Sequence, residues 1–452
     1  MQQIPVRNVP STTTAVGGKI HVRLTEGKFQ NLRRIISGPL LLAYLLLVWI
    51  EVDGQPWLLF DFSSHRIQMF GTSLSWYDLP LLAGVMIAGS ALLFFMAVGW
   101  GRLWCGFACP QSIWTWLFIR IETFTEGRSS VRARQEANSL RGKRLLRRIA
   151  KHLLWLLAAF ITALTFTGYF VPVRELVSDL AQLQLDWTST GWLITMTALT
   201  YLNAGLAREK VCTHMCPYAR FQGVMFDSAT RTVSYDAARG EPRSNQRNRG
   251  SDSGDCVDCG LCVQVCPTGI DIRDGLQYEC IDCAACIDAC DAVMDKVGRE
   301  RGLIRFASEQ QLSKQSSPLW RPRLIGYAVV VMLSVAATVW GFSQRSPVLI
   351  EIQRERGALF QVDSANNICN YYQMKLEAFD DGLKPFQVIL TGPDGLTLKG
   401  PSVVEVSLKP RWFDYRVCSP AGTMKGTSEI AFEISNGTLQ LSKSSTFIAP
   451  GI

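Results

Sequence analysis

The chain has 452 residues, of which 48% are hydrophobic and 19% are charged, and its mean hydropathy is +0.12. A chain of this length has room for several domains, and it is more apolar than most soluble proteins, so we expect a membrane protein. The formal net charge of +8 collects beside apolar stretches, where basic residues set topology and meet anionic lipid. We therefore expect membrane lipid as a partner and exclude a nucleic-acid-binding function.

Five stretches without charged residues are candidates for membrane spans. A helix needs about 20 apolar residues to cross a hydrocarbon core of roughly 30 Å. The stretches cover residues 35–50, 80–101, 153–173, 187–207 and 324–342. The first is short and contains Gly38 and Pro39, so a buried soluble helix is its alternative. The five together predict a five-helix transmembrane bundle. The basic lead before residue 35 has no signal-peptide cleavage site and is expected to be retained.

The loops between these stretches differ in charge, and the difference predicts their orientation. Between the second and third stretches, basic residues greatly outnumber Glu122, Glu126 and Glu136, whereas the loops after the first and third stretches are mainly acidic. Lys and Arg concentrate in cytoplasmic loops. The N-terminus and residues 208–323 are therefore predicted to lie in the cytoplasm, and residues 343–452 on the opposite side of the membrane.

The chain is predicted to divide into five segments. They are a cytoplasmic N-terminal segment (1–34), a bundle of four spans (35–238), a linker with a cysteine-rich domain (239–323), a fifth span (324–342) and an outer domain (343–452). Residues 239–255 are rich in Gly, Ser, Asn and Arg and predict a flexible linker. In the outer domain, apolar and polar residues alternate between turn signals, which predicts a small β-sandwich. Its Cys369 and Cys418 are predicted to form a disulfide, and two free buried cysteines are the alternative.

Eight cysteines in the cysteine-rich domain have the spacing of a two-cluster ferredoxin, so we expect an α+β ferredoxin-like domain inserted before the last span. In such proteins three thiolates of a C-x2-C-x2-C run bind one 4Fe-4S cluster, and the fourth Cys ligates the other cluster. One cluster is therefore assigned to Cys256, Cys259, Cys262 and Cys290, and the other to Cys280, Cys283, Cys286 and Cys266. Structural zinc sites are the alternative, although they use paired C-x2-C elements. The second run ends in Asp291 where the first has Pro267, which leaves the ligands intact.

A second motif, Cys-x-x-x-Cys-Pro, occurs twice. Its copies are Cys105, Cys109 and Pro110, and Cys212, Cys216 and Pro217, each just past the inner end of a predicted span. On a helix, residues i and i+4 share a face, so two sulfurs can grip one ion or form a redox pair. Soft thiolates favour Cu(I), zinc or iron–sulfur centres, and His214 and Met215 are open as further ligands. Buried, inert cysteines are the alternative, which the duplication disfavours. The aromatic residues that follow the first copy suit an interfacial helix, with a re-entrant segment as its alternative.

These motifs resemble one family over residues 20–342. The matching segments read GRLWCGFACPQ (101–111), VCTHMCPYARFQ (211–222), CVDCGLCVQVCPTGIDI (256–272), LQYECIDC (276–283) and GLIR (302–305). They resemble the cytochrome c oxidase accessory protein family CcoG, also called FixG or RdxA. The outer domain is similar to the family's immunoglobulin-like C-terminal domain in architecture alone, and its two cysteines are not part of the pattern.

The resemblance implies a multidomain protein of the bacterial inner membrane, with a periplasmic outer domain. It implies a cupric reductase that supplies Cu(I) during assembly of a cbb3-type cytochrome c oxidase. Copper is then the substrate or a transient ligand of Cys105, Cys109, Cys212 and Cys216, and two 4Fe-4S clusters carry the electrons. The implied partners are oxidase assembly factors or subunits and a cytoplasmic electron donor. Two alternatives remain, namely an electron conduit from the quinone pool and a non-catalytic assembly scaffold.

Overall fold

The structure, a computed structural model, describes residues 15–16, 19–52, 54–62, 66–70, 72–75, 78–136, 141–244, 252–318, 320–355, 357–379, 383–407 and 410–450. Parts of the predicted N-terminal segment (1–14 and 17–18) and of the predicted linker (245–251) lie outside these residues. The chain folds as two compact units. The first contains Met1–Asp61 and Pro80–Val339, and the second contains Phe62–Leu79 and Trp340–Ile452.

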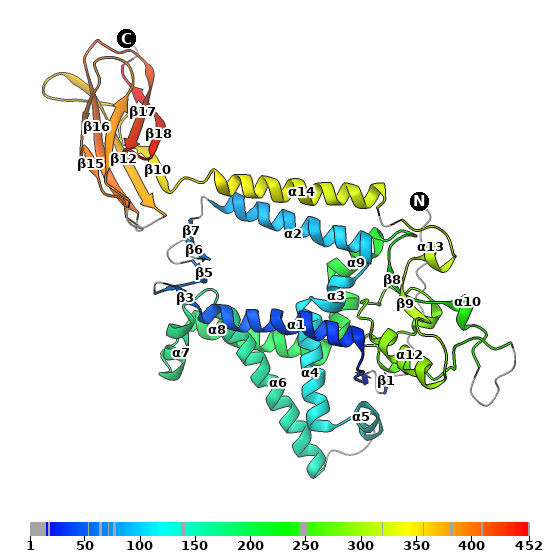
Figure 1. Ribbon diagram of the computed structural model, residues 1–452. Coiled ribbons are helices and arrows are strands. Elements are labelled where there is room, and N and C mark those ends of the chain that lie inside the picture. The colour runs from blue at the N-terminus through cyan, green and yellow to red at the C-terminus, as the bar shows by residue number, and fades with distance from the viewer. Residues whose placement is uncertain are drawn as a thin grey trace. The chain divides into compact units, whose positions relative to one another are not determined.

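Four of the described helices are long and apolar enough to cross a membrane (Figure 1). They are α1 (Lys28–Leu46), which the 3-10 turn η1 (Leu47–Trp49) continues, α2 (Leu79–Trp100), α6 (Lys143–Thr167) and α14 (Pro322–Ser343). Two of them begin earlier than predicted, because their basic first turns are helical before the apolar residues start. α1 begins at Lys28 rather than at residue 35, and Pro39 lies inside it without ending it.

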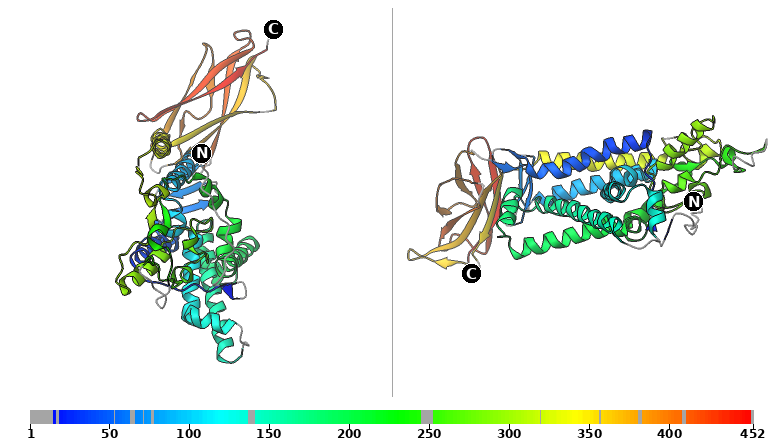
Figure 2. Two further views of the ribbon diagram at one scale, coloured as in Figure 1. Left: turned by 90° about the vertical axis from the view of Figure 1, so that its right-hand side faces the viewer. Right: turned by 90° about the horizontal axis from the view of Figure 1, so that it is seen from below.

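The remaining predicted span, residues 187–207, is helical throughout, but the helix changes from α to π along its length. α8 (Trp187–Thr200) starts at Asp186, whose carboxylate accepts hydrogen bonds from the N–H groups of Thr188 and Ser189. It continues without a gap into the π-helix η3 (Tyr201–Ala207). α8 lies beside α6 along its length, as Figure 2 also shows. π-Helical turns are rare and are frequently found at functional sites, and η3 leads to the second Cys-x-x-x-Cys-Pro element.

α4 (Pro110–Glu126) runs across the long helices rather than along them (Figure 1), which is the direction expected of an interfacial helix. It packs against α6 and η3 in one core. The indole Nε1 of Trp155 donates to the carbonyl oxygen of Phe118 over 3.0 Å, and Ala159 and Ala204 complete the contact. The fully buried Trp155 thereby fixes where α4 crosses the bundle.

A cluster of buried charged side chains stabilises the same contact between α4, α6 and η3. Glu122 of α4 is 1% exposed, and its carboxylate lies 2.5 Å from Nη1 of Arg132 and 2.9 Å from Nη2 of Arg208. The Nζ atom of Lys151 lies 3.9 Å from Glu122 and 2.9 Å from Glu126. Buried charges are stable only when they are paired. These pairs therefore tie α4 to α5 (Ser129–Glu136), α6 and the end of η3.

The cysteine-rich segment has an α+β fold, as predicted, around two antiparallel strands, β8 (Thr232–Tyr235) and β9 (Ile304–Ala307). Its helical elements are α9 (Pro217–Met225), α10 (Ala237–Gly240), α11 (Leu261–Gln264), the 3-10 turn η5 (Ile272–Asp274), α12 (Ala285–Lys296) and α13 (Glu309–Leu312). The shorter elements of this unit are β1 (Ala15–Val16), β2 (Lys19–Ile20), β3 (Glu51–Val52), β4 (Gln55–Pro56), β5 (Leu58–Asp61) and α7 (Val173–Ala181).

The cysteine-rich segment packs directly on the helical bundle. The carboxylate of Asp288 in α12 accepts hydrogen bonds from the backbone N–H groups of Phe29 and Gln30 over 3.1 and 2.7 Å. A carboxylate at this position satisfies the free donors of the α1 N-terminus and complements its dipole. A Cβ atom on Gly27 would collide with Asp288. The start of α1 and the cysteine-rich segment are therefore held together.

The second unit is a sandwich of two antiparallel sheets. One has the order β10-β12-β16-β14 with β11 paired to β12, and the other has the order β15-β13-β17-β18. The strands are β10 (Val348–Arg354), β11 (Gln361–Val362), β12 (Asn367–Ala378), β13 (Phe386–Thr391), β14 (Thr397–Lys399), β15 (Val403–Val404), β16 (Arg411–Pro420), β17 (Thr427–Ser435) and β18 (Gln440–Ile448). Inward-facing aromatic side chains such as Tyr372, Tyr415 and Phe432 form the core. The hairpin of β6 (Arg66–Met69) and β7 (Thr72–Ser75) joins this unit through an ion pair of 2.8 Å between Arg66 and Glu377.

The predicted disulfide between Cys369 and Cys418 is present and links directly opposed residues of β12 and β16. It closes a loop with a sequence separation of 49, so the chain-entropy model assigns it about 4 kcal/mol of stability. We expect the double variant Cys369→Ala, Cys418→Ala to lower the free energy of unfolding of this unit by about that amount. Denaturant unfolding followed by the fluorescence of the full-length protein measures it, with reduced wild-type protein as the control. Equal stability of variant and wild type would contradict the expectation.

Candidate functional site

Eight cysteines line two separate cavities in the cysteine-rich segment. The first cavity is lined by Cys256, Cys259, Cys262 and Cys290. The second is lined by Cys266, Cys280, Cys283 and Cys286, and Cys262 also borders it. The remaining walls are mostly aliphatic, including Leu303 and Ile304 in the first cavity and Ile270 and Ile272 in the second. The structure thus brings together the two sets of four cysteines that the spacing assigns crosswise.

This arrangement of thiols fits iron–sulfur clusters. Each cavity takes three thiols from one run and the fourth from the other run, as in two-cluster ferredoxins. Burial raises the pKa of Cys262 to about 12 and that of Cys283 to about 11. A bound metal centre is therefore needed to keep these thiols deprotonated.

The two cavities differ in their access to solvent. Cys259 of the first cavity is exposed, whereas the other seven cysteines are buried or half-buried. Arg273 borders the first cavity and forms ion pairs with Asp258 and Asp271 over 2.5 and 2.6 Å. The first cavity therefore has a thiol at the protein surface, whereas none of the four thiols assigned to the second cavity is exposed.

The two Cys-x-x-x-Cys-Pro elements share a local structure, but it differs from the predicted one. Each pair was expected on one helix face. Instead, Cys105 lies in the short helix α3 (Leu103–Phe107), and Cys109 is the N-cap of α4. Cys212 lies in the π-helix η4 (Val211–Met215), and Cys216 is the N-cap of α9. The cause is the proline that follows each second cysteine, because proline suits the first turn of a helix but cannot continue the preceding one.

All four of these thiols come into electrostatic range of one another. Cys105 interacts with Cys109, Cys212 and Cys216, and Cys109 also interacts with Cys216. Burial raises the pKa of Cys105 to about 12 and that of Cys212 to about 11, and the neighbouring thiols add to both increases. The two thiols therefore carry protons at neutral pH until a cation displaces them.

His214 and Met215, which the sequence leaves open as further ligands, are both exposed. The Nδ1 atom of His214 is hydrogen-bonded to the hydroxyl of Thr213 over 2.6 Å, and Met215 is 67% exposed. The less exposed side chains of the two elements are therefore the four cysteines rather than His214 and Met215.

The first Cys-x-x-x-Cys-Pro element approaches the second cavity through its backbone. A Cβ atom added to Gly106 would lie 2.8 Å from the carbonyl oxygen of Asp282 and 2.9 Å from the Cα atom of Cys283. Because these are backbone atoms, they cannot move aside as a flexible side chain can. Cys105 shares an apolar cluster with Cys283 and Cys286. Gly106 therefore permits the close approach of α3 to the loop that carries the thiols of the second cavity.

Arg102 joins three parts of the site. Its guanidinium donates to the carbonyl oxygens of Tyr278, Cys280 and Ala219, and its backbone N–H donates to Asp282 over 2.8 Å. The enclosed Asp282 also accepts from the backbone N–H of Val233. A guanidinium carries five N–H donors in one plane, so Arg102 can donate to several carbonyl oxygens at once. Arg102 thus fastens both thiol elements to the cysteine-rich loop.

Gln222 and Asp282 also help to position the site, but neither belongs to a motif that would identify it in the sequence. Gln222 is fully buried, and its Oε1 atom accepts a hydrogen bond from the Sγ atom of Cys105 over 3.3 Å. Asp282 lies between two of the eight cysteines and reads as an ordinary polar loop residue. The signal that could have identified Gly106 was its place directly beside Cys105, where a small residue permits close backbone contact.

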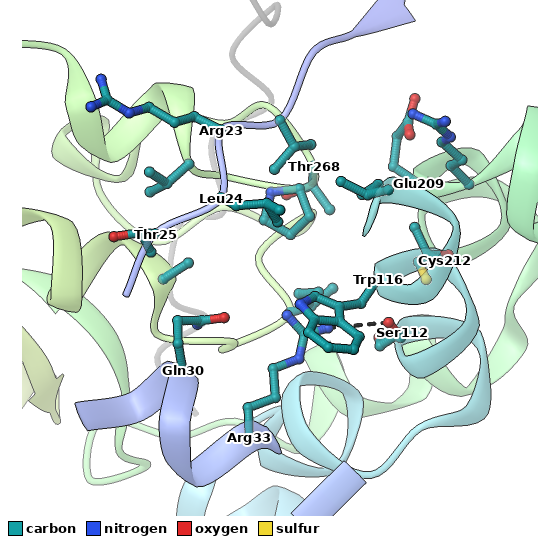
Figure 3. Close-up of a pocket in the computed structure, with 18 residues that line it drawn as sticks. Arg23, Leu24, Thr25, Gln30, Arg33, Ser112, Trp116, Glu209, Cys212 and Thr268 are labelled. Carbon is teal, nitrogen blue, oxygen red and sulfur yellow. Dashed lines mark hydrogen bonds between the residues drawn. The ribbon is translucent and has the colours of Figure 1, made fainter. Parts of the chain in front are cut away.

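A pocket lies between Cys212 and the loop of the cysteine-rich segment that contains Pro267 and Thr268 (Figure 3). Thr268 and Pro267 of the cysteine-rich loop form one wall, and Cys212 lies on another. Trp116 of α4 and Arg33 of α1 extend along its floor, and Arg33 donates to the carbonyl oxygen of Ser112. The lining also includes Arg23, Leu24, Thr25, Gln30 and Glu209. It combines apolar surface with a few convergent polar groups, as small-molecule sites do.

The two parts of the chain match two family models. A model described as a 4Fe-4S dicluster domain matches residues 207–309. A model described as an IG-like fold at the C-terminal of FixG matches residues 338–450. The cysteine cavities and the sandwich of the second unit lie within these matches.

Relatives cover most of the chain. It is 34% identical over 399 residues to the nitrogen fixation protein FixG of Rhizobium meliloti, covering 79% of this chain and 76% of the relative. It is 35% identical over 390 residues to protein RdxB of Cereibacter sphaeroides, covering 82% of each. A solved FixG-related protein from Vibrio parahaemolyticus matches 23% of this chain and 97% of its own, with 17% identity and a TM-score of 0.22. The chain therefore belongs to the FixG family, together with RdxB, and has that family's 4Fe-4S dicluster domain and immunoglobulin-like C-terminal domain.

Proposed function

We propose that this protein reduces Cu(II) to Cu(I) at the cytoplasmic face of the inner membrane, for assembly of a cbb3-type cytochrome c oxidase. Cys256, Cys259, Cys262 and Cys290 would hold one 4Fe-4S cluster, and Cys266, Cys280, Cys283 and Cys286 the other. When bound, such clusters supply one electron at a time, which is what one Cu(II) ion requires. Cys105, Cys109, Cys212 and Cys216 would bind the copper substrate, because soft thiolates favour Cu(I) over Cu(II).

The observation that carries this proposal is the contact between Gly106 and the backbone of Cys283. It brings Cys105 into one apolar cluster with Cys283 and Cys286 of the second cavity. The first cavity has the exposed Cys259, and neither Gly106 nor Cys283 is among the residues that line it. We infer an order in which a cytoplasmic donor delivers electrons at Cys259, and copper receives them beside Cys283.

The packing of α1 supports five spans and the predicted orientation. Asp288 binds the start of α1, so α1 begins on the same side of the membrane as the cysteine-rich segment. An even number of crossings must then separate the two. α1, α2 and α6 supply three, and the unbroken helix of α8 and η3 is the fourth. α14 is the fifth and leads to the second unit, where the disulfide fits the oxidising periplasm.

The experiment that tests the function replaces all four thiols with Ser in the full-length protein purified without oxygen. Copper reduction, followed with a Cu(I)-specific chelator after chemical reduction of the protein, is expected to fall to the background rate. Iron content should be unchanged, since none of the four thiols lines the two cavities. The control is the double variant Cys369→Ser, Cys418→Ser, which also removes cysteines but should reduce copper normally. Normal copper reduction by the fourfold variant would refute the proposal.

A second candidate function is electron transfer from the quinone pool to a redox partner. The pocket beside Cys212 favours it, because Trp116 and the aliphatic lining suit a flat apolar ring, and Gln30 and Arg33 lie within reach of ring oxygens. Quinol would then lose two electrons to the clusters and two protons to water. Reduction of the clusters by a soluble quinol analogue, together with no copper binding, would favour this function over copper reduction. Normal oxidase assembly by a variant without clusters would instead favour a non-catalytic scaffold.

A further inference from the structure

A strongly basic cavity of about 210 Å³ lies outside the site described above, where α4, α5 and α6 meet. Six cationic side chains and two carboxylates line it. The cations are Arg132, Lys143, Arg144, Arg147, Arg148 and Lys151, and the carboxylates are Glu126 and Glu136. The cavity therefore has an excess of positive charge in a confined space.

The carboxylates of this basic cavity already have partners. Glu126 lies 2.9 Å from Nζ of Lys151, and Glu136 lies 3.0 Å from Nε2 of His21. No described carboxylate lies within ion-pair distance of Lys143, Arg147 or Arg148. The positive charges of these side chains repel one another, which destabilises the cavity. A bound anion would reduce this repulsion.

A buried donor gives a second, independent indication of a ligand. Arg132 is 4% exposed, and its Nη1 and Nη2 atoms bind Glu122 and the carbonyl oxygen of Val22. Its buried Nε atom has no hydrogen-bond partner among the described residues. A buried donor without a partner is costly. Arg132 lines the basic cavity, so an acceptor oxygen bound there would lie beside this guanidinium.

The position of the cavity suits a phosphate group. It surrounds the first two turns of α6, a candidate membrane span whose apolar residues follow directly, so it lies at the level of lipid headgroups. The N-cap Gly142 offers no side-chain acceptor to the first N–H groups of α6. Helix N-termini with free N–H groups attract phosphate. We propose that this basic cavity binds the phosphate group of an anionic ligand, supplied by a lipid headgroup or by a soluble phosphate.

The test uses full-length protein that has been purified in detergent and freed of lipid. Native mass spectrometry measures the retention of phosphatidylglycerol and of zwitterionic phosphatidylcholine, and thermal unfolding measures stabilisation by inorganic phosphate. We compare the variant Lys143→Gln, Arg147→Gln, Arg148→Gln with the control Arg34→Gln, Arg128→Gln, Arg134→Gln, which removes the same charge outside the cavity. Each basic residue near a phosphate surface contributes a factor of about five, so the cavity variant should bind roughly a hundredfold more weakly than the control.

The lipid-retention measurement and the stabilisation by inorganic phosphate together identify the source of the phosphate group. Retention of phosphatidylglycerol over phosphatidylcholine, without stabilisation by inorganic phosphate, indicates a lipid headgroup. Stabilisation by inorganic phosphate that only the cavity variant loses indicates a soluble ligand. The proposal is overturned if wild-type protein retains both lipids equally and gains nothing from phosphate. It is also overturned if the cavity variant, with normal iron content, binds as tightly as the control.

Discussion

Gly106→Ala is expected to separate the thiol elements from the cysteine cavities without removing any cysteine. The new methyl group would lie 2.8 Å from the carbonyl oxygen of Asp282 and 2.9 Å from the Cα atom of Cys283. Both distances are too short, and both atoms belong to the backbone, so α3 and the cysteine-rich loop must move apart. Overpacking a tight contact costs about 1–3 kcal/mol, and a displacement near 1 Å can slow a reaction by up to about a hundredfold.

The measurement is the rate at which Cu(II) reoxidises the reduced protein, followed by the visible absorbance of the clusters in an anaerobic stopped-flow instrument. We expect slow reoxidation in Gly106→Ala with wild-type iron content. The matched control is Gly223→Ala on α9, where a Cβ atom would meet the ring of Tyr278 at an ordinary 3.6 Å. A Gly106→Ala protein that is reoxidised at the wild-type rate would show that the close approach of α3 has no role in electron delivery.

The regular features of this protein were predictable because they leave periodic signals. Charge-free stretches identified four candidate spans, alternation identified the sandwich, and cysteine spacing identified the crosswise sets that line the two cavities. The opposed positions of Cys369 and Cys418 depend on strand register. Their pairing could nevertheless be expected, because each was left without another partner in the same domain.

The features that sequence reasoning missed depend on contacts between distant segments. Arg102 and Asp282 are 180 positions apart, and Asp288 and Gln30 are 258 apart. No local pattern marks such pairs. The geometry of the Cys-x-x-x-Cys-Pro elements was predicted incorrectly for a different reason. The i and i+4 rule assumes a continuous helix, whereas each proline starts a new helix directly after the second cysteine. The two prolines are therefore a stronger signal for the local structure than the spacing of the cysteines.

Glu122→Gln is the second substitution for which we expect a large effect. Glu122 is buried, and its carboxylate contacts Arg132 and Arg208. The amide keeps the shape of the side chain but removes the charge that balances these cations. Leaving a buried charge without its partner costs about 3–5 kcal/mol. We therefore expect the unfolding midpoint in mixed detergent and dodecyl sulfate micelles to fall well below that of the wild type.

The matched control is Glu126→Gln, one turn along the same helix. Its carboxylate pairs with Lys151 and is 18% exposed, and Lys151 would keep Glu122 at 3.9 Å, so replacing Glu126 should cost less than replacing Glu122. If Glu122→Gln were no more destabilising than Glu126→Gln, the ion cluster would not be what holds α4 to η3. Arg208 ends η3 shortly before Cys212, and α4 begins directly after Cys109. The pair between Glu122 and Arg208 thus links the helices that follow one thiol element and precede the other. Copper reduction by Glu122→Gln should consequently decline before its iron content does, because the thiol pairs would separate while both cysteine cavities remain intact.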